Sequence, residues 1–252
     1  IIEKFRKKFK IIRIFNNKIN LGCAQSRNKI ISHSRGEVIA FFDADDFSLS
    51  ERLRLQYQRI IKYEKKSKSR FIACYTSGKR IYANGYIKDF NAVGSLNSFE
   101  IIGKEICDFL LFNRKSKNLF YGSGTPACSL MARKDTFLKV GEFDKGLARQ
   151  EDIDFAIRMG FKGGHFIGIK EKVLKQYSTP SPKKHPKVEF NSSLKIIEKN
   201  SAYLKKKKIH DYIKNWTKLR YFHFSKKFIS FLIILIKLLF KYPLRTLYHA
   251  FN

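Results

Sequence analysis

Three carboxylates follow a short apolar run. The run spans residues 38–42, and the carboxylates are those of Asp43, Asp45 and Asp46. A continuous apolar run of this length predicts a strand buried on both faces, as in a parallel sheet covered by helices. The carboxylates would then stand at the C-terminal end of that strand, where open α/β sheets place their ligands. Asp43 and Asp45 can direct two hard oxygen ligands at one point, which suits Mg²⁺ or Mn²⁺. A solvated acidic loop would show the same pattern, so these residues alone leave both interpretations open.

A second group of acids, Glu151, Asp152 and Asp154, lies far downstream at the start of a helix predicted over residues 151–159. In the first turn of a helix the macrodipole stabilises the ionised carboxylate that a general base requires. Asp154 is also spaced to pair with Arg158 at i, i+4. First-turn acids are common for helix stability alone, so the downstream group does not by itself establish catalysis.

Taken together and in order, the two groups resemble family 2 glycosyltransferases. Residues 20–28 carry N-L-G and S-R-N, residues 35–37 read R-G-E, and residues 39–46 read I-A-F-F-D-A-D-D. These are similar to the family's N-x-G, A-R-N, G-E and F-L-D-A-D-D segments, with Ser26 and Phe42 in place of Ala and Leu. Residues 141–158 carry G-E-F-D and E-D-I-D followed by Arg, similar to the family's G-x-F-D and E-D-x-D…R. Ordered multi-residue blocks are more specific than one motif, and the similarity runs over roughly residues 5–178.

The resemblance implies a GT-A-type (Rossmann-like) α/β fold, with a mixed sheet flanked by helices. It implies a nucleotide-sugar donor and a glycan or lipid-linked acceptor, with acceptor contacts around residues 121–126. A single base without a second nucleophilic carboxylate implies direct displacement, and therefore inversion at the anomeric carbon. The biological setting expected from the resemblance is the synthesis of a bacterial surface polysaccharide.

The same resemblance assigns roles to individual residues. Asp45 is the expected metal ligand, assisted by Asp43 through the ion or through the ribose, and the cofactor is Mn²⁺ or Mg²⁺. Asn20 and Arg27 match positions that line the nucleotide, although Arg27 could also be a cation on a helix surface. Asp152 matches the family's general base, with Glu151 in support. We expect Asp46 to cap the following turn and Asp154 to pair with Arg158.

The start of the chain differs from the family pattern. Family members begin with a strand, a helix and a second strand that supply most of the base pocket, and this chain opens at Ile1, in what looks like the end of the following helix. We therefore expect an N-terminally truncated piece of a longer protein.

Charge separates the possible partners. The chain has 52 basic and 21 acidic residues, a formal net charge of +31, which predicts attraction to nucleic acid or to an anionic membrane surface. Neither zinc-type Cys/His spacing nor an RNP-like strand is present, so we expect no specific nucleic-acid partner.

A hydrophobic content of 44% excludes a wholly disordered chain. The four cysteines contain no C-x-x-C pair, which favours a reducing cytosol over a disulfide framework.

We expect a catalytic domain over residues 1–178 and a basic helical tail over residues 179–252, divided by a proline-rich stretch. The apolar run 228–240 is interrupted by Lys237 and is shorter than the ~20 residues that a transmembrane helix needs. A helix lying in the interface of an anionic membrane is favoured, which places the protein in the cytoplasm, peripheral on the inner face of the cytoplasmic membrane. The alternative is a buried helix that closes the catalytic domain.

Local patterns predict the remaining elements. Residues 48–51 form an S-x-x-E capping box for a helix to residue 65, and Asn84-Gly85 predicts a type I′ hairpin over residues 80–90. Other helices are expected at 21–34 and 134–140, and strands at 10–15, 71–77, 127–132, 165–169 and 172–178.

Two other functions remain open at this point. One is a basic binding protein without catalysis, attached to a membrane surface or to nucleic acid. The other is a degenerate transferase that has lost its donor pocket.

Overall fold

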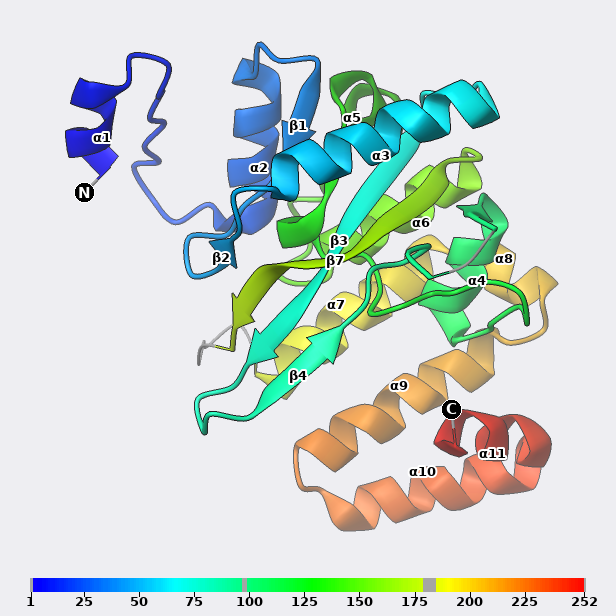
Figure 1. The fold of residues 1–252 in the computed structure, drawn as a ribbon. Coiled ribbons are helices and arrows are strands. Elements are labelled where there is room, and N and C mark those ends of the chain that lie inside the picture. The colour runs from blue at the N-terminus through cyan, green and yellow to red at the C-terminus, as the bar shows by residue number, and fades with distance from the viewer. Residues whose placement is uncertain (1, 97–98, 179–184, 252) are drawn as a thin grey trace.

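A computed structural model describes residues 2–96, 99–178 and 185–251. At its centre is a seven-stranded mixed sheet in the order β1-β6-β3-β7-β2, with β4 beside β3 and β5 beside β7 (Figure 1). The long strands β3 (Ile72–Ile81) and β7 (His165–Tyr177) pair in parallel, and the other described pairs are antiparallel. The shorter strands are β1 (Val38–Ala40), β2 (Phe47–Ser48), β4 (Ile87–Phe90), β5 (Ile101–Ile102) and β6 (Met131–Arg133).

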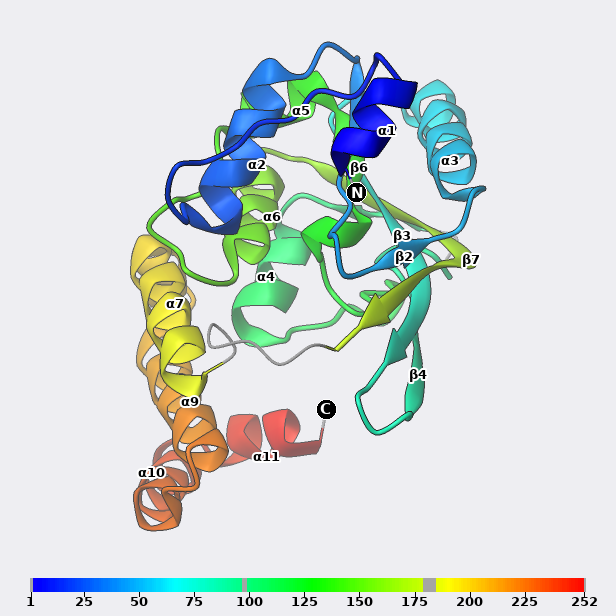
Figure 2. The same ribbon diagram turned by 90° about the vertical axis from the view of Figure 1, so that its left-hand side faces the viewer.

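Helices cover both faces of the sheet, as Figure 2 shows. Side chains alternate along β3, so that Ile72 and Cys74 pack with α3 (Arg52–Ser67) while Ala73 and Tyr75 face the other side. That second face carries the larger core, which also takes in four further helices. They are α2 (Gly22–His33), α4 (Lys104–Phe112), α5 (Lys134–Val140) and α6 (Glu151–Phe161). The mixed sheet flanked by helices therefore agrees with the α/β fold class expected from the sequence.

The C-terminal part is helical, as expected, and its first helices share the main core. Buried side chains such as Ile196, Leu204 and Tyr212 belong to the same apolar cluster as Phe155 of α6. The helices are α7 (Pro186–Lys199), α8 (Ser201–Lys206), α9 (His210–Phe224), α10 (Phe228–Lys241) and α11 (Pro243–Phe251). The expected boundary at residues 178/179 adjoins residues 179–184, which lie outside the described residues, so the division into two domains stays a proposal.

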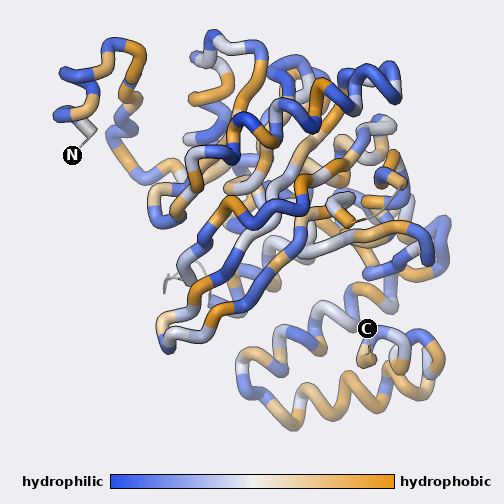
Figure 3. Tube along the Cα trace, viewed as in Figure 1, coloured by the Kyte–Doolittle hydropathy of each residue, from blue (hydrophilic) through white to orange (hydrophobic). Residues whose placement is uncertain are grey.

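Helix α10 is the most apolar of these segments, and its orange trace stands out in Figure 3. Leu238 is its buried side chain, whereas Ile229, Ile236 and Phe240 are exposed. Within the described residues, every helix falls short of the length and apolarity needed to cross a bilayer.

Several local predictions were wrong. Residues 10–15 form irregular chain after α1 (Ile2–Lys8) instead of a strand, and the chain between 127 and 132 starts as a 3₁₀ turn, η1 (Ala127–Ser129). The strands predicted at 165–169 and 172–178 are one strand, β7, whose register against β3 shifts near Ser77. Strand β1 does end in the acidic loop, but it pairs antiparallel with β6 and not in a parallel sheet.

Two turn predictions also differ. The capping box is not formed, because Ser50 Oγ donates to Glu51 Oε1 and no side chain caps the first turn of α3. In the hairpin, the Gly85 N–H bonds to the carbonyl of Tyr82, and of the Asn84-Gly85 pair only Gly85 has a positive φ, of 80°. A type I′ turn needs positive φ at both central residues, so Gly85 instead closes a longer turn.

Candidate active site

The acidic loop after β1 is held in place by a buried arginine, Arg52 of α3. Its Nη2 donates to the carbonyls of Phe41 at 2.9 Å and Cys128 at 2.8 Å, and its guanidinium lies 4.3 Å from the centre of the Phe42 ring. Arg52 is 1% exposed. The strand end that carries Asp43 is thus held by hydrogen bonds to carbonyls that would otherwise be unpaired. The sequence analysis did not identify Arg52.

Arg27 joins the two acidic groups. From α2, its Nη1 donates to Glu151 Oε1 and its Nη2 donates to Asp43 Oδ1 at 3.3 Å. The side chain is 12% exposed, so Arg27 is not a cation on a helix surface. Burial lowers the pKa of Arg27, but Glu151 and Asp43 outweigh burial and the pKa stays above its usual range. Carboxylates far apart in the sequence therefore meet around one guanidinium.

Asp152 stands beside this cluster in the first turn of α6. Its Oδ2 accepts from the Ala127 N–H at 3.2 Å and its Oδ1 from the Ile153 N–H at 2.9 Å. Burial, and next the neighbouring charge of Glu151, raise the pKa of Asp152 to about 6, although Arg27 and the two N–H donors act in the opposite direction. A carboxylate with this pKa is ionised at neutral pH and still basic enough to accept a proton.

Asp152 also lines a pocket of ≈ 270 Å³, which includes Thr125, Pro126 and Arg149. The pocket takes in the chain around residues 121–126, where the sequence predicts acceptor contacts. The Nε atom of Arg149 is buried without a hydrogen-bond partner among the described residues. A buried donor of this kind is costly unless a ligand or water accepts its hydrogen bond. Arg149 was not identified from the sequence.

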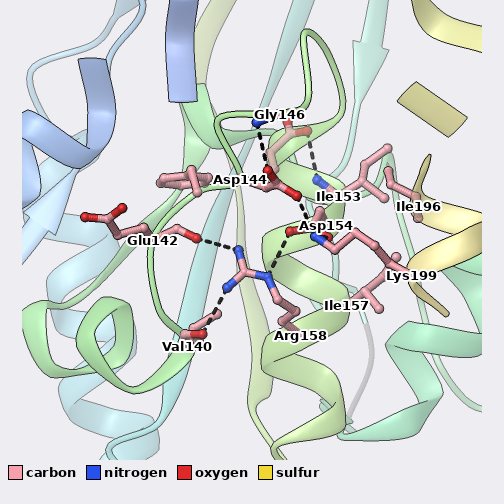
Figure 4. Close-up of polar contacts among 12 residues, drawn as sticks. Val140, Glu142, Asp144, Gly146, Ile153, Asp154, Ile157, Arg158, Ile196 and Lys199 are labelled. Carbon is pink, nitrogen blue, oxygen red and sulfur yellow. Dashed lines mark hydrogen bonds and ion pairs between the residues drawn. The ribbon is translucent and has the colours of Figure 1, made fainter. Parts of the chain in front are cut away.

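The loop that leads into α6 is held by the hydrogen bonds and ion pairs drawn in Figure 4. Asp154, 1% exposed, accepts from Arg158 Nε at 2.8 Å, as the i, i+4 spacing predicts, and also pairs with Lys199 of α7. Arg158 donates further to the carbonyls of Val140 at 2.9 Å and Glu142 at 2.7 Å. Asp154 and Arg158, the last acid and the arginine of the E-D-I-D…R segment, therefore position the loop that precedes α6.

Helix α7 holds the same loop from the other side. Ser192 Oγ accepts from the Arg149 N–H at 3.3 Å, and Ser193 Oγ donates to Gln150 Oε1 at 3.0 Å. Gln150 has a left-handed φ of 64°, which is unusual for a residue with a side chain. The helix that begins with Glu151 thus follows a strained residue that α7 holds in place.

Three side chains that could bind a metal ion lie near Asp43, and of these the carboxylates suit Mn²⁺ or Mg²⁺ whereas the Cys128 thiol is a soft ligand. Ligand atoms of Asp43, Asp46 and Cys128 lie within 4.8 Å of one another. Asp46 Oδ2 is buried without a hydrogen-bond partner among the described residues, and burial, followed by the charge of Asp43, raises the pKa of Asp46. Such an oxygen fits a cation-binding role, because a buried carboxylate needs a compensating positive charge or donor. Asp45 lies exposed in the turn between them and is outside this group.

Two of the predicted residues accept hydrogen bonds from backbone N–H groups. Asp46 Oδ1 accepts from the Tyr177 N–H of β7 at 3.2 Å, so the predicted cap on the following turn is wrong. Asn20 Oδ1 accepts from the Gly22 N–H at 3.0 Å at the start of α2, and its role toward a nucleotide stays a prediction.

Comparison with known proteins agrees with this geometry. The family described as Glycosyl transferase family 2 matches residues 1–120. Residues 1–120 therefore belong to glycosyl transferase family 2. An uncharacterized glycosyltransferase of Methanocaldococcus jannaschii is 30% identical over 181 residues, which are 72% of this chain and 55% of that protein. A cholesterol galactosyltransferase of Borreliella burgdorferi is 39% identical over 59 residues, 23% of this chain and 16% of that protein. The chain thus spans only about half of the first relative and less of the second.

Solved structures support the fold of this chain. Staphylococcus aureus TarS 1-349 in complex with UDP has a TM-score of 0.52 and 19% identity, covering 90% of this chain and 59% of that one. GalNAc-T7 with UDP, GalNAc and Mn²⁺ also has a TM-score of 0.52, with 16% identity, covering 78% of this chain and 38% of that one. The GT-A-type fold expected from the sequence is confirmed.

Proposed function

We propose that this chain transfers a sugar from a nucleotide-sugar donor to an acceptor hydroxyl, with inversion at the anomeric carbon. The observation that carries the proposal is the bridge of Arg27 between Asp43 and Glu151, with Asp152 adjacent to Glu151. Family membership of residues 1–120 supports the reaction class, and the UDP in the structures of two fold neighbours supports a uridine nucleotide.

In this proposal Asp152 is the general base. The acceptor oxygen bonds to the anomeric carbon, its proton passes to Asp152, and the diphosphate leaves with the bonding electrons. Asp152 opens into a pocket large enough for an acceptor group, and its two backbone N–H donors fix the orientation of the carboxylate. Glu151 keeps Arg27 in place beside Asp43 and raises the pKa of the base.

Asp43 and Asp45 would hold a divalent cation, Mn²⁺ or Mg²⁺, and the buried oxygen of Asp46 fits the same role. When bound, the cation supplies positive charge against the leaving diphosphate. Arg27 and Asn20 would contact the nucleotide from the start of α2, and a guanidinium suits phosphate oxygens. The Mn²⁺ in the GalNAc-T7 structure is consistent with this cofactor.

We further propose that the protein acts at the inner face of the cytoplasmic membrane, in building a surface glycan on a glycan or lipid-linked acceptor. The exposed apolar side of α10 lies among basic residues, which is the composition of an interfacial helix. The basic side chains are Lys226, Lys227, Lys237 and Lys241. The name of the Borreliella burgdorferi relative, a cholesterol galactosyltransferase, supports a lipid acceptor.

The test is turnover of a panel of UDP-sugars with Mn²⁺ or Mg²⁺, in the presence of membrane extract as acceptor source. Asp152→Asn keeps the shape of the side chain and removes the proton acceptor, so transfer should fall by about 10²–10⁴-fold. Donor binding should change little, and NMR of the product should give inverted anomeric configuration. Turnover of Asp152→Asn within about threefold of wild type would place the base elsewhere.

A further inference from the structure

A cavity of ≈ 1010 Å³ lies between the glycosyltransferase core and the C-terminal helices. Its volume is at the upper end of small-molecule sites, which run from about 300 to 1,000 Å³. Aromatic and aliphatic side chains dominate its described lining, which has no acidic residue. They come from α4, α6, α7, α9 and α10, for example Phe109, Ile153, Ile197, Trp216 and Leu235. Polar lining residues such as Asn113, Arg220 and His223 are fewer than the apolar ones, so the larger part of the cavity suits an apolar chain.

This cavity adjoins the pocket of Asp152. Five residues line both spaces: Leu110, Ser123, Gly124, Gln150 and Ile153. The polar end of the combined space is lined by Asp152 and Arg149. A ligand that fills both spaces would therefore have an apolar body and a polar head, with the head at the proposed base.

Helix α10 presents apolar side chains to two sides. Phe231 and Leu235, spaced four residues apart, line the cavity. Ile229 and Ile236, 79% and 63% exposed, belong to a different stripe. At 100° per residue the two pairs are centred about 130° apart on the helix, so they lie on different faces of it. A helix with one apolar face outward and one lining a cavity can lie between a membrane surface and the site.

We propose that the cavity holds the single apolar chain of a lipid acceptor whose hydroxyl-bearing head lies at Asp152. The proposal rests on the proposed function and specifies the acceptor class. The lipid hydroxyl loses its proton to Asp152 as its oxygen bonds to the anomeric carbon, and the bond from that carbon to the diphosphate oxygen breaks. The chain remains between α4 and α9–α10, which sets the position of the head.

Trp216 is the chain's single tryptophan and lines the cavity, so its fluorescence reports on this space alone. The probe is 1-(9,10-dibromostearoyl)glycerol below its micellar concentration, compared with the unbrominated stearoylglycerol. Bromine close to the indole quenches its emission, so we expect saturable quenching by the first compound only. Unsaturable quenching, or equal effects of the two compounds, would overturn the proposal.

A matched pair of variants locates the site. Leu235→Phe adds bulk inside the cavity, whereas Ile236→Phe adds a ring on the exposed face of the same helix. Leu235→Phe should weaken probe binding by about tenfold, since overpacking commonly costs that much, and Ile236→Phe should not. Leu110→Phe, in the shared lining, serves as a second filling variant if Leu235→Phe melts early. Equal probe affinity in a folded filling variant and in wild type would refute the assignment.

Activity separates this inference from the proposed function. If probe binding follows the expected pattern while no donor is turned over, the proposed function fails and the cavity assignment stands. If sugar is transferred equally well to glycerol and to stearoylglycerol, and Leu235→Phe changes neither rate, the lipid acceptor is refuted. Light scattering that shows a dimer closing the cavity, with no probe binding, would refute it in favour of a second copy of the chain.

Discussion

The acid side of the pH-rate profile tests the assignment of Asp152 most directly. Burial and the charge of Glu151 raise its pKa from 3.8 to about 6, so the ionised, basic form is lost as the pH falls through 6. The value of kcat/KM reports groups of the free enzyme, and below pH 6 it should fall tenfold per pH unit. Glu151→Gln removes a neighbouring negative charge, which lowers the pKa of Asp152 and moves this fall to lower pH.

The size of the shift follows from the order of the two causes. Burial comes first and remains in the variant, so the pKa should drop by part of the interval between 6 and 3.8, on the order of one unit. At pH 5 about a tenth of Asp152 is ionised with a pKa of 6, and about half with a pKa of 5. Relative to its own plateau at pH 8, Glu151→Gln should therefore retain about fivefold more activity at pH 5 than wild type.

The assay is release of the nucleoside diphosphate across pH 4.5–8.5 at constant ionic strength. Glu142→Gln is the matched control, because it makes the same charge change in the loop that precedes α6, where its carboxylate is exposed. Glu142→Gln should leave the profile in place. A profile without an acid limb near pH 6, or one that both variants shift equally, would contradict the assignment of Asp152 as the base.

Four further measurements test the rest of the site. Asp152→Asn should raise Tm at pH 8, because at a pH above 6 the ionised Asp152 destabilises the folded state and Asn carries no charge. In thermal melts the difference should vanish below pH 3.8, where Asp152 is protonated in both the folded and the unfolded state. Arg158→Ala should lower the free energy of unfolding by about 1.5–3 kcal/mol in urea titrations, because it removes one charged partner of buried Asp154 and leaves Lys199 as the other; a change below ~1 kcal/mol would contradict the positioning network. Asp45→Ala should abolish Mn²⁺-dependent turnover with an unchanged Tm, and wild-type turnover that survives a chelator would refute the metal role. The double variant Ile229→Glu, Phe240→Glu should reduce flotation with anionic liposomes. Liposome binding of the wild type should weaken with salt, because each nearby Lys contributes about 1 kcal/mol of screened attraction. Equal flotation of the wild type and the double variant would argue against α10 as the membrane contact.

The parts of the site that the sequence predicts are those with local causes. Helix α5 has the bounds 134–140 that the sequence indicates, and the Asp154–Arg158 pair follows from i, i+4 spacing. Motif order alone placed Asp43 and Asp152 in one site, and Arg27 is the side chain between them. These features need no knowledge of the path that the chain takes between the two acidic blocks.

The missed parts depend on distant contacts. Arg52 bonds to the carbonyl of Cys128, 76 positions away in the sequence, and nothing in the local pattern of α3 predicts that contact. The antiparallel pairing of β1 with β6 decides that Cys128 comes near Asp43, so a ligand group that includes it could not be derived from spacing. Residues 10–15 look like a strand because they are mostly apolar, yet the described sheet offers them no partner strand, and an apolar segment without a partner does not form one.

The contact of α7 with Gln150 defines the minimal unit that can be expected to work. A backbone held at φ 64° without glycine costs of order 1–3 kcal/mol, and the Ser193 hydrogen bond is one of the interactions that hold it. Lys199 likewise supplies a counter-charge to Asp154. A recombinant fragment ending at residue 178 would keep every motif residue and lose both restraints. We therefore propose that the folding unit extends at least through α7, beyond the last motif residue.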